Sequence, residues 1–279
     1  MCLGIFISLR IFNFPDITAD GSYTLGGVIT AVGIMAGWPL PLVFSASVLA
    51  GMLAGTATGL IHTRLKINSL LSGILVMTAL YSVNLNILGR SNLPLALDTE
   101  NIFSYFTLFS TSTINNFFTL TLIVGVLAIF ISWLLKTDFG LSMRAAGNNI
   151  KMARSFGINA NFIKIIGLAI ANGFIAISGF LIVQMQGFAD INMGVGIVIL
   201  GLGAVIIGET VSELAGFKKI FLRVCGVILG SIIFRLVLSF AISAGINPNW
   251  MKLLTALIVL LIIGIPSLIP SLSKKIKLE

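Results

Sequence analysis

Few side chains in this sequence could carry out covalent chemistry, and their spacing brings none of them into a catalytic set. His62 is the only histidine, and Cys2 and Cys225 lie in apolar runs without a partner at metal-binding or redox spacing. A Ser/His/Asp set, an activated cysteine or a metal centre needs more than these residues. The phosphate-binding pattern G-x-x-x-x-G-K-[ST] is also missing from the sequence. We therefore expect no enzyme activity, no bound cofactor or metal and no ATP hydrolysis by this chain alone.

The remaining polar candidates are acids and amides near the ends of apolar runs. Such groups can hydrogen-bond a polar solute, although amides within a membrane also join helices to one another. Acidic side chains are scarce inside the apolar runs, which disfavours coupling to proton or sodium movement. If the protein pumps a solute, we expect another subunit to supply the energy. The candidates for a solute pathway are Asp16, Asp20, Asn84, Asn86, Gln184, Gln186 and Asp190.

The composition of the chain is strongly apolar. Of 279 residues, 57% are hydrophobic and only 9% are charged, with a mean hydropathy of +1.11. This leaves too little polar surface to cover a soluble globule, so we expect a polytopic membrane protein. The formal net charge of +8 does not indicate nucleic acid, because the basic residues lie at the ends of apolar runs. Membrane topology and anionic lipid account for them.

The apolar runs predict an all-α membrane protein with a single transmembrane domain over residues 1–279. We expect about eight to nine transmembrane or re-entrant helices, since a crossing needs roughly 20 apolar residues. The first run, 3–14, is shorter than this, and we expect the first span to be clipped at its amino end. The longer runs are 42–61, 69–88, 117–135, 165–183, 220–242 and 253–268.

Glycine and proline mark where the helices are interrupted or approach each other closely. Pro15 and Gly21 predict a helix break beside Asp16 and Asp20, which is either an acidic turn or irregular backbone lining a wet cavity. The glycine-rich run 25–38 is short enough to be broken or re-entrant. By contrast, the three glycines at four-residue steps in run 42–61 predict close packing against another helix. They are Gly51, Gly55 and Gly59.

Two glycine-rich segments show a weak internal sequence similarity, which we call the echo. The sequence Phe14-Pro15-Asp16-Ile17 resembles Phe188-Ala189-Asp190-Ile191, and each precedes a short glycine-rich run. Paired interrupted segments of this kind mark the substrate path in many transporters. The echo therefore suggests a two-fold internal repeat, although chance similarity between apolar, glycine-rich segments is common.

The segment 136–164 is the longest polar interruption that is rich in positive charge. Apolar residues recur in it at three- and four-residue steps, which predicts an amphipathic helix in short pieces. Gly147 is expected to weaken the helix. Asn148 is expected to cap the helical piece that follows, and Gly157 is expected to end that piece. The segment either rests on lipid headgroups or docks on a cytoplasmic partner. Its excess of basic residues places it inside the cell.

The other basic clusters give the same orientation. Those near residues 64–66, 218–223 and 274–277 all fall on the cytoplasmic side under either of two arrangements. In the first, the run 25–38 does not cross the membrane fully. In the second, the clipped amino terminus lies outside. The sequence leaves both arrangements open.

Three motifs together resemble a known family of transport proteins. The first lies in the basic segment and comprises Thr137-x-Phe139-Gly140, Arg144-Ala145-x-Gly147-x-Asn149 and Ala153-x-x-x-Gly157-Ile158. The other two are the segments 14–22 and 201–209. These patterns are similar to bacterial ABC importer permeases of the branched-chain amino acid, ribose and basic membrane protein type, most closely a branch associated with aromatic amino acid uptake. The short amino end departs from that family, which has a longer first span.

The resemblance implies a multi-pass homodimeric subunit of the bacterial cytoplasmic membrane, surrounded by lipid, that imports a small solute such as an amino acid. A separate cytoplasmic ATPase would bind ATP and Mg²⁺, and an extracytoplasmic lipoprotein or periplasmic protein would deliver cargo. Nucleic acid is not an expected partner. An ion-gradient-coupled transporter or exporter is the alternative, and a scaffold that does not transport is a third class. By resemblance, the ATPase-coupling residues are Phe139, Gly140, Arg144, Ala145, Gly147, Asn149, Lys151, Ala153, Arg154, Gly157 and Ile158.

Overall fold

The computed structural model describes residues 1–96, 101–104, 112–217, 219–247 and 250–268. It divides into two compact units. The first holds residues 3–195 together with Met1, and the second holds Cys2 and the chain from residue 196 onward. Each unit is described by itself.

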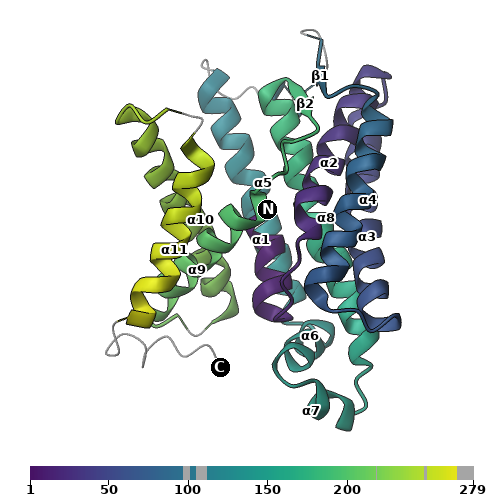
Figure 1. The fold of residues 1–279 in the computed structure, drawn as a ribbon, viewed down its shortest axis with the longest axis vertical. Coiled ribbons are helices and arrows are strands. Elements are labelled where there is room, and N and C mark those ends of the chain that lie inside the picture. Colours follow the sequence, from purple (N-terminus) through teal and green to yellow (C-terminus); the bar gives the residue numbers. More distant parts are fainter. Residues whose placement is uncertain (97–100, 105–111, 218, 248–249, 269–279) are drawn as a thin grey trace. The chain divides into compact units, whose positions relative to one another are not determined.

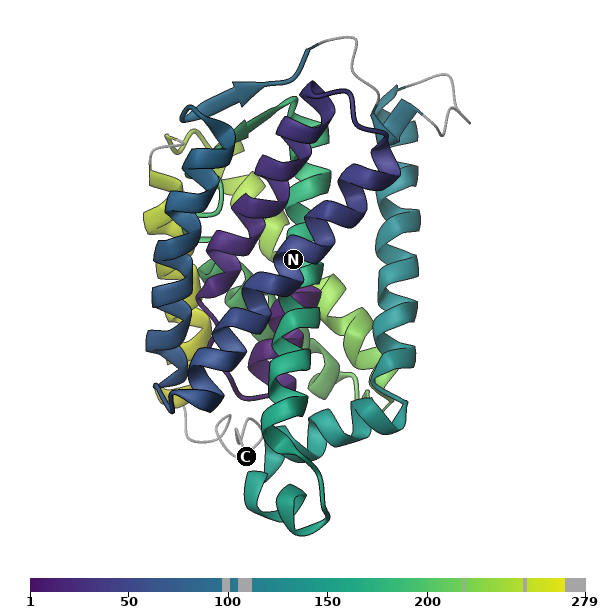
Figure 2. The same cartoon turned by 90° about the vertical axis from the view of Figure 1, so that its right-hand side faces the viewer.

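The first unit is a bundle of helices (Figures 1 and 2). The chain begins with α1 (Cys2–Ile5), which continues into a short π-helix, η1 (Phe6–Ile11). The remaining helices are α2 (Thr18–Met35), α3 (Leu40–Arg64), α4 (Ser69–Leu88), the 3-10 turn η2 (Ile102–Ser104), α5 (Ser112–Leu134), α6 (Asp138–Asn148), α7 (Ile150–Ser155) and α8 (Ala160–Gln186).

Helix α2 lies at the centre of this bundle and packs against α3, α4 and α8. Fifteen of its eighteen residues are buried. A helix that is largely covered by protein can carry polar residues such as Asp20, Ser22 and Thr30 without exposing them to lipid. Its glycines sit where neighbouring backbones come close; a Cβ on Gly26 would meet the backbone of Ala176 in α8.

The three glycines of α3 form its contact with α8, as the sequence predicts. A Cβ atom on Gly51 would lie 2.7 Å from the Asn172 carbonyl oxygen, and one on Gly59 would lie 2.8 Å from the Ile165 Cα. A Cβ on Gly55 would collide with the Leu168 carbonyl. The two backbones can therefore approach only because all three side chains are missing.

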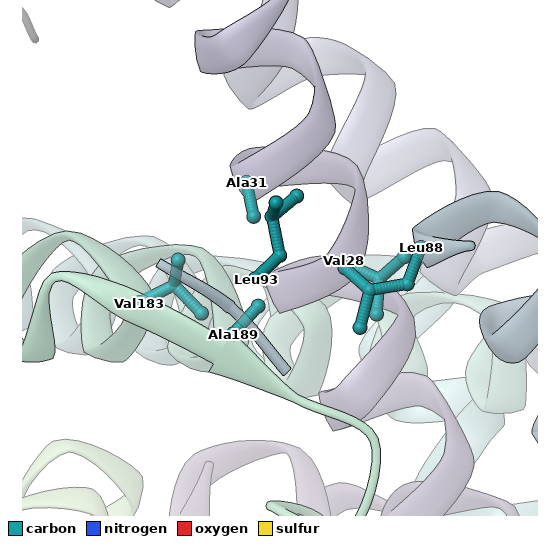
Figure 3. Close-up of a cluster of buried hydrophobic side chains, with 6 residues drawn as sticks. All are labelled: Val28, Ala31, Leu88, Leu93, Val183 and Ala189. Carbon is teal, nitrogen blue, oxygen red and sulfur yellow. The ribbon is translucent and has the colours of Figure 1, made fainter. Parts of the chain in front are cut away.

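One end of the first unit is closed by a small sheet that the all-α prediction missed. Strands β1 (Asn92–Pro94) and β2 (Phe188–Asp190) pair antiparallel with Leu93 opposite Ala189. Gly89 and Gly187 end α4 and α8 in left-handed conformations and turn both chains toward this pairing. Figure 3 shows the buried cluster beneath, formed by Val28, Ala31, Leu88, Leu93, Val183 and Ala189. Three-residue strands carry too little periodicity to be read from sequence.

The second unit contains α9 (Ile197–Leu214), α10 (Ile220–Ser243) and α11 (Met251–Leu268). Helices α9 and α10 pack closely, because a Cβ on Gly208 would lie 2.6 Å from the Val227 Cα. Ala204, Phe234, Leu238 and Val259 form the buried core of the three helices.

Six helices in the described residues are long and apolar enough to cross a membrane: α3, α4, α5, α8, α9 and α10. Helices α3, α4, α5, α8 and α10 overlap predicted spans, and α9 overlaps the glycine-rich run that follows Ile191. The count of eight to nine and the internal repeat remain predictions. Two predicted breaks are wrong. Gly21 lies inside the continuous helix α2, and the break is the segment between Ile11 and Thr18. The glycine-rich run 25–38 lies mostly within the same unbroken helix, and its re-entrant course stays a prediction.

Candidate functional site

The polar segment 136–164 folds into two short helices, α6 and α7, at the end of the first unit opposite the β1–β2 sheet (Figures 1 and 2). The Thr137 hydroxyl oxygen accepts a hydrogen bond from the Gly140 N–H at 3.3 Å and caps the start of α6. Gly140 itself lies against the backbone of Leu134 and Leu135, where a side chain would not fit. The Thr-x-x-Gly spacing thus turns the chain sharply out of α5 into α6.

Helix α7 is bounded by two turn motifs. Asn149 caps it by accepting the Met152 N–H at 3.0 Å, so the predicted cap at Asn148 is off by one residue. Asn148 is still helical, whereas a cap residue needs the extended backbone that Asn149 has. At the other end the Ile158 N–H donates to the Ala153 carbonyl at 3.1 Å, and Gly157 is left-handed with φ 78°. This is a Schellman stop, which accounts for the Ala153-x-x-x-Gly157-Ile158 pattern.

The two helices form a groove of about 370 Å³, which we call the coupling groove because several residues predicted for ATPase coupling line it. Apolar side chains on it are uncovered: Leu141 is 56% exposed, Met152 58% and Phe156 73%. Arg144 is partly buried in its wall, and its Nε atom has no hydrogen-bond partner. The groove is lined by Leu141, Arg144, Ala145, Asn148, Asn149, Met152, Ala153 and Phe156.

The other predicted coupling residues lie around this groove. Phe139 is half-buried in the first turn of α6, and Lys151 is exposed on α7. Arg154 lines a different cavity and donates to the Asn161 side chain at 3.2 Å. Gly147 faces the core of the unit, where a Cβ would collide with the Ile11 carbonyl at the end of η1. Gly147 is therefore a point of close contact between α6 and η1 as well as a residue of weak helix propensity.

A buried polar cluster lies where the chain breaks between η1 and α2. Asp16 Oδ2 accepts a hydrogen bond from the Asn172 amide nitrogen at 2.7 Å, and Asp16 Oδ1 accepts one from the Thr18 N–H at 2.9 Å. Ser22 donates to the Asn172 side-chain oxygen at 2.7 Å, and the hydroxyls of Thr18 and Thr58 are 2.7 Å apart. These five residues, the buried polar cluster, join α2 to both α3 and α8.

Every hydrogen-bonding group of the Asn172 side chain is used. Its nitrogen also donates to the Leu168 carbonyl at 3.0 Å, so both N–H groups and the oxygen have partners. A polar group in a membrane bundle is tolerated when it is satisfied in this way. The cluster therefore fixes the position of the break relative to α8.

A short connector, residues 11–17, links this cluster to α6. The Ile11 carbonyl touches α6 at Gly147, and the Phe12 ring fills the space beside Gly167 of α8. The Phe14 ring meets the His62 ring edge to face with centroids 5.0 Å apart. The connector is thus held at its start by α6 and at its end by Asn172.

The residues predicted for a solute pathway separate into distinct places. Asp16, Asp20 and Asn84 are buried near the start of α2, where the Asn84 side-chain nitrogen donates to the Gly21 carbonyl at 3.3 Å and its Oδ1 has no partner. Gln184 is buried near the other end of α8 and accepts the Ile102 N–H at 2.8 Å. Asn86, Gln186 and Asp190 are not buried. The structure thus brings three of the seven together.

Sequence reasoning missed Asn172, Thr58 and Ser22. The available signal was an isolated asparagine in the middle of the apolar run 165–183, because an amide there needs partners inside the protein. Among the described residues, no group of three His, Cys, Asp or Glu side chains is placed to hold a metal ion. In the part of the chain that the structure describes, the arrangement offers an apolar groove and buried hydrogen bonds, which suit binding.

These features define a class: a multi-pass membrane protein with two short helices, α6 and α7, between its candidate spans α5 and α8. The model of the family described as "branched-chain amino acid transport system / permease component" matches residues 1–264. The chain belongs to that family. It is the permease subunit of an ABC-type importer in the bacterial inner membrane, and it is not an enzyme.

Individual relatives agree with this assignment. The tyrosine transport system permease protein of Clostridioides difficile is 40% identical over 98% of this chain and 89% of its own length. An autoinducer 2 import system permease protein of Salmonella paratyphi B is 25% identical over 88% of this chain and 68% of its own. The galactofuranose transporter permease protein of Escherichia coli is 25% identical over 90% and 71%. No solved structure gives a significant match.

Proposed function

We propose that this permease imports an amino acid or a similar small polar molecule, and that a cytoplasmic ATPase drives it through the coupling groove. The observation that carries the proposal is the groove itself, on a chain of a permease family. An uncovered apolar surface of this kind, rimmed by polar and basic side chains, is typical of a protein interaction site. The 40% identity to a tyrosine permease favours an aromatic amino acid as cargo over a sugar.

The ATPase would place part of its surface in the coupling groove and bury Leu141, Met152 and Phe156. Arg144 supplies a guanidinium with an unpaired Nε at the groove wall, which suits a carboxylate of the partner. Phe139, Gly140, Ala145, Gly147, Asn149, Ala153, Gly157 and Ile158 would act by shaping α6 and α7, and Lys151 and Arg154 by adding charge. ATP and Mg²⁺ would bind to the ATPase.

Movement of the coupling helices would reach the transport path through the connector. When α6 shifts, Gly147 carries Ile11 with it, and the connector transmits the shift to Asp16 and so to α2 and α8. Packed interfaces of this type tend to switch between discrete arrangements rather than deform continuously. Alternating access then follows, with α2 changing its position among α3, α4 and α8.

Several finer features belong to this proposal. Two copies of the chain would form the pore, and an extracytoplasmic binding protein would deliver the cargo. Asn86 on α4 is exposed in the single chain, and an amide that faces lipid is costly, so a second copy of the chain or water would contact it.

The helix count and the internal repeat also belong to this proposal. The helices α2 and α11 would complete a count of eight with the six candidate spans. Asp16 and Asp190 each bond the N–H two residues later, which supports the internal repeat.

Copurification of the partner ATPase tests the docking site. The variant Arg144→Glu places a carboxylate in the groove wall and should abolish association. Lys136→Glu is the matched control, because Lys136 is exposed near the end of α5 and does not line the groove. Unchanged copurification with Arg144→Glu, or equal loss with both variants, would reject the coupling groove as the docking site.

A further inference from the structure

A second cavity lies beside the coupling groove, on the other side of α7. It has a volume of about 350 Å³ and is walled by the last turns of α3, by α7 and by the first turns of α8. On α7 its lining residues are Ile150 and Arg154, whereas the coupling groove uses Met152 and Ala153. The cavity and the coupling groove are therefore lined by different residues of one short helix, α7.

This cavity gathers basic side chains without an acidic one. Lys66, Arg154 and Lys164 line it together with His62, and no Asp or Glu is among its lining residues. Arg154 and Lys164 line the same hollow of about 350 Å³, so their positive charges lie near each other. In the described part of the chain, none of these three cations forms an ion pair; Arg154 bonds only the neutral Asn161 amide. An anion bound between these like charges would offset their mutual repulsion.

Neutral side chains also line the cavity. His62 Nδ1 is 2.8 Å from the Ile67 carbonyl, which can only accept, so the Nδ1 proton is donated to Ile67 and not into the cavity. The Thr63 hydroxyl likewise donates to the Gly59 carbonyl at 2.7 Å, whereas the Asn161 amide is a neutral donor in the cavity wall. Lys66 adopts a left-handed backbone with φ 58°, which is uncommon for lysine and holds it at the turn beside the cavity. Three cationic side chains and one neutral amide around a small hollow suit the oxygens of a phosphate group.

The position of the cavity agrees with a phosphate at the membrane surface. It lies at the ends of the candidate spans α3 and α8, on the side that carries the basic loop. Phe162 and Leu65, next in sequence to the lining residues Asn161 and Lys66, are 55% and 66% exposed. Basic pockets between transmembrane helices on the cytoplasmic side are known to hold anionic headgroups.

We propose that this basic cavity binds a phosphate-bearing anion, supplied either by an anionic phospholipid headgroup or by free phosphate in the cytoplasm. The site is separate from the coupling groove, and it does not depend on the proposed cargo. Because Arg154 also belongs to the predicted coupling set, the test rests on the two lysines.

The experiment uses the full chain purified in detergent. Native mass spectrometry measures retention of phosphatidylglycerol against phosphatidylcholine, and equilibrium dialysis measures binding of labelled inorganic phosphate. Lys66→Asn/Lys164→Gln removes two charges, with Asn chosen because it tolerates the left-handed backbone. Arg64→Gln/Lys136→Gln is the matched control, which removes two exposed cytoplasmic charges that do not line the cavity.

We expect the lysine variant to bind its anion about 30-fold more weakly, and the control to stay within about threefold of the wild type. Selective retention of phosphatidylglycerol identifies a lipid; binding of inorganic phosphate identifies the free anion. Binding of neither, or equal loss in both variants, overturns the proposal. The proposal is also overturned if the lysine variant no longer copurifies with the ATPase while its anion binding is unchanged. That result would assign the lysines to a carboxylate of the ATPase. If the double variant does not fold, Lys66→Asn alone is measured with Arg64→Gln as its control.

Discussion

The side-chain amide of Asn172, in the middle of α8, donates a 2.7 Å hydrogen bond to Asp16, which lies in the break between η1 and α2. The two residues are 156 positions apart in the chain. Both are buried, and each has its other polar atoms bonded to the protein. This bond fixes the end of the connector whose beginning is held by α6.

Removing the Asn172 amide should therefore lower the stability of the helix bundle. Asn172→Leu leaves Asp16 Oδ2 and the Ser22 hydroxyl without their partner, which costs about 1–3 kcal/mol for each buried group left unsatisfied. Thermal unfolding in detergent should show a lower midpoint. Ser178→Ala is the control, because the Ser178 hydroxyl bonds only its own helix at Ile175. A Leu variant as stable as the control would contradict the role given to Asn172.

The close contact between α3 and α8 predicts a second effect on stability. Gly55→Val would drive a side chain into the Leu168 backbone, which cannot move aside as a flexible side chain could. We expect a loss of about 3 kcal/mol or more. Gly125→Ala in α5 is the control, since nothing lies within 4 Å of a Cβ there, and it should be neutral or slightly stabilising. Similar unfolding midpoints for both variants would disprove the close packing.

Much of the fold could be predicted, because a span is signalled by the length of one apolar run. Helix α4 matches its predicted range of residues 69–88, and the glycine face of α3 was correctly expected to pack against another helix. Helix α2 was harder, since protein rather than lipid surrounds it and its polar residues obscure the apolar signal. The β1–β2 pairing depends on two segments nearly 100 residues apart, and such contacts leave no local pattern.

The candidate site, like the fold, could be predicted from the sequence only in part. The turns around α6 and α7 follow from local chemistry, so Gly157 was correctly placed, and only the choice between Asn148 and Asn149 failed. The buried polar cluster could not be assembled from sequence, because its members come from three helices and each alone looks like an ordinary span residue. Asp16 was found by its type, whereas Asn172 becomes informative only when Asp16 is seen beside it.

The Schellman stop of α7 gives a test of the coupling loop. Gly157→Val forces a branched side chain into the left-handed region and should cost about 1–2 kcal/mol locally. Trypsin should then cleave faster at Lys151 and Arg154, as the end of α7 loosens. Gly157→Asn, which tolerates this conformation, should keep the wild-type cleavage rate. If Val and Asn behave alike, the backbone conformation at Gly157 is not what holds the loop.

Phe156 should be a major contact for the ATPase, since it is the most exposed large apolar residue of the coupling groove. Phe156→Ala should weaken association with the ATPase at least tenfold, the usual effect of removing an aromatic anchor from an interface. The free permease should keep its unfolding midpoint, because the ring touches solvent in the absence of a partner. Leu65→Ala, similarly exposed but outside the groove, serves as the control in a pull-down titration.

Uptake into proteoliposomes is the most direct test of the central claim. The permease is reconstituted with its ATPase and its extracytoplasmic binding protein, and accumulation of labelled tyrosine is followed with other amino acids as competitors. We predict uptake that requires ATP, is insensitive to an uncoupler and is lost in Arg144→Glu but kept in Lys136→Glu. Uptake that persists without ATP and collapses with the uncoupler would contradict an ATP-driven mechanism coupled through α6 and α7.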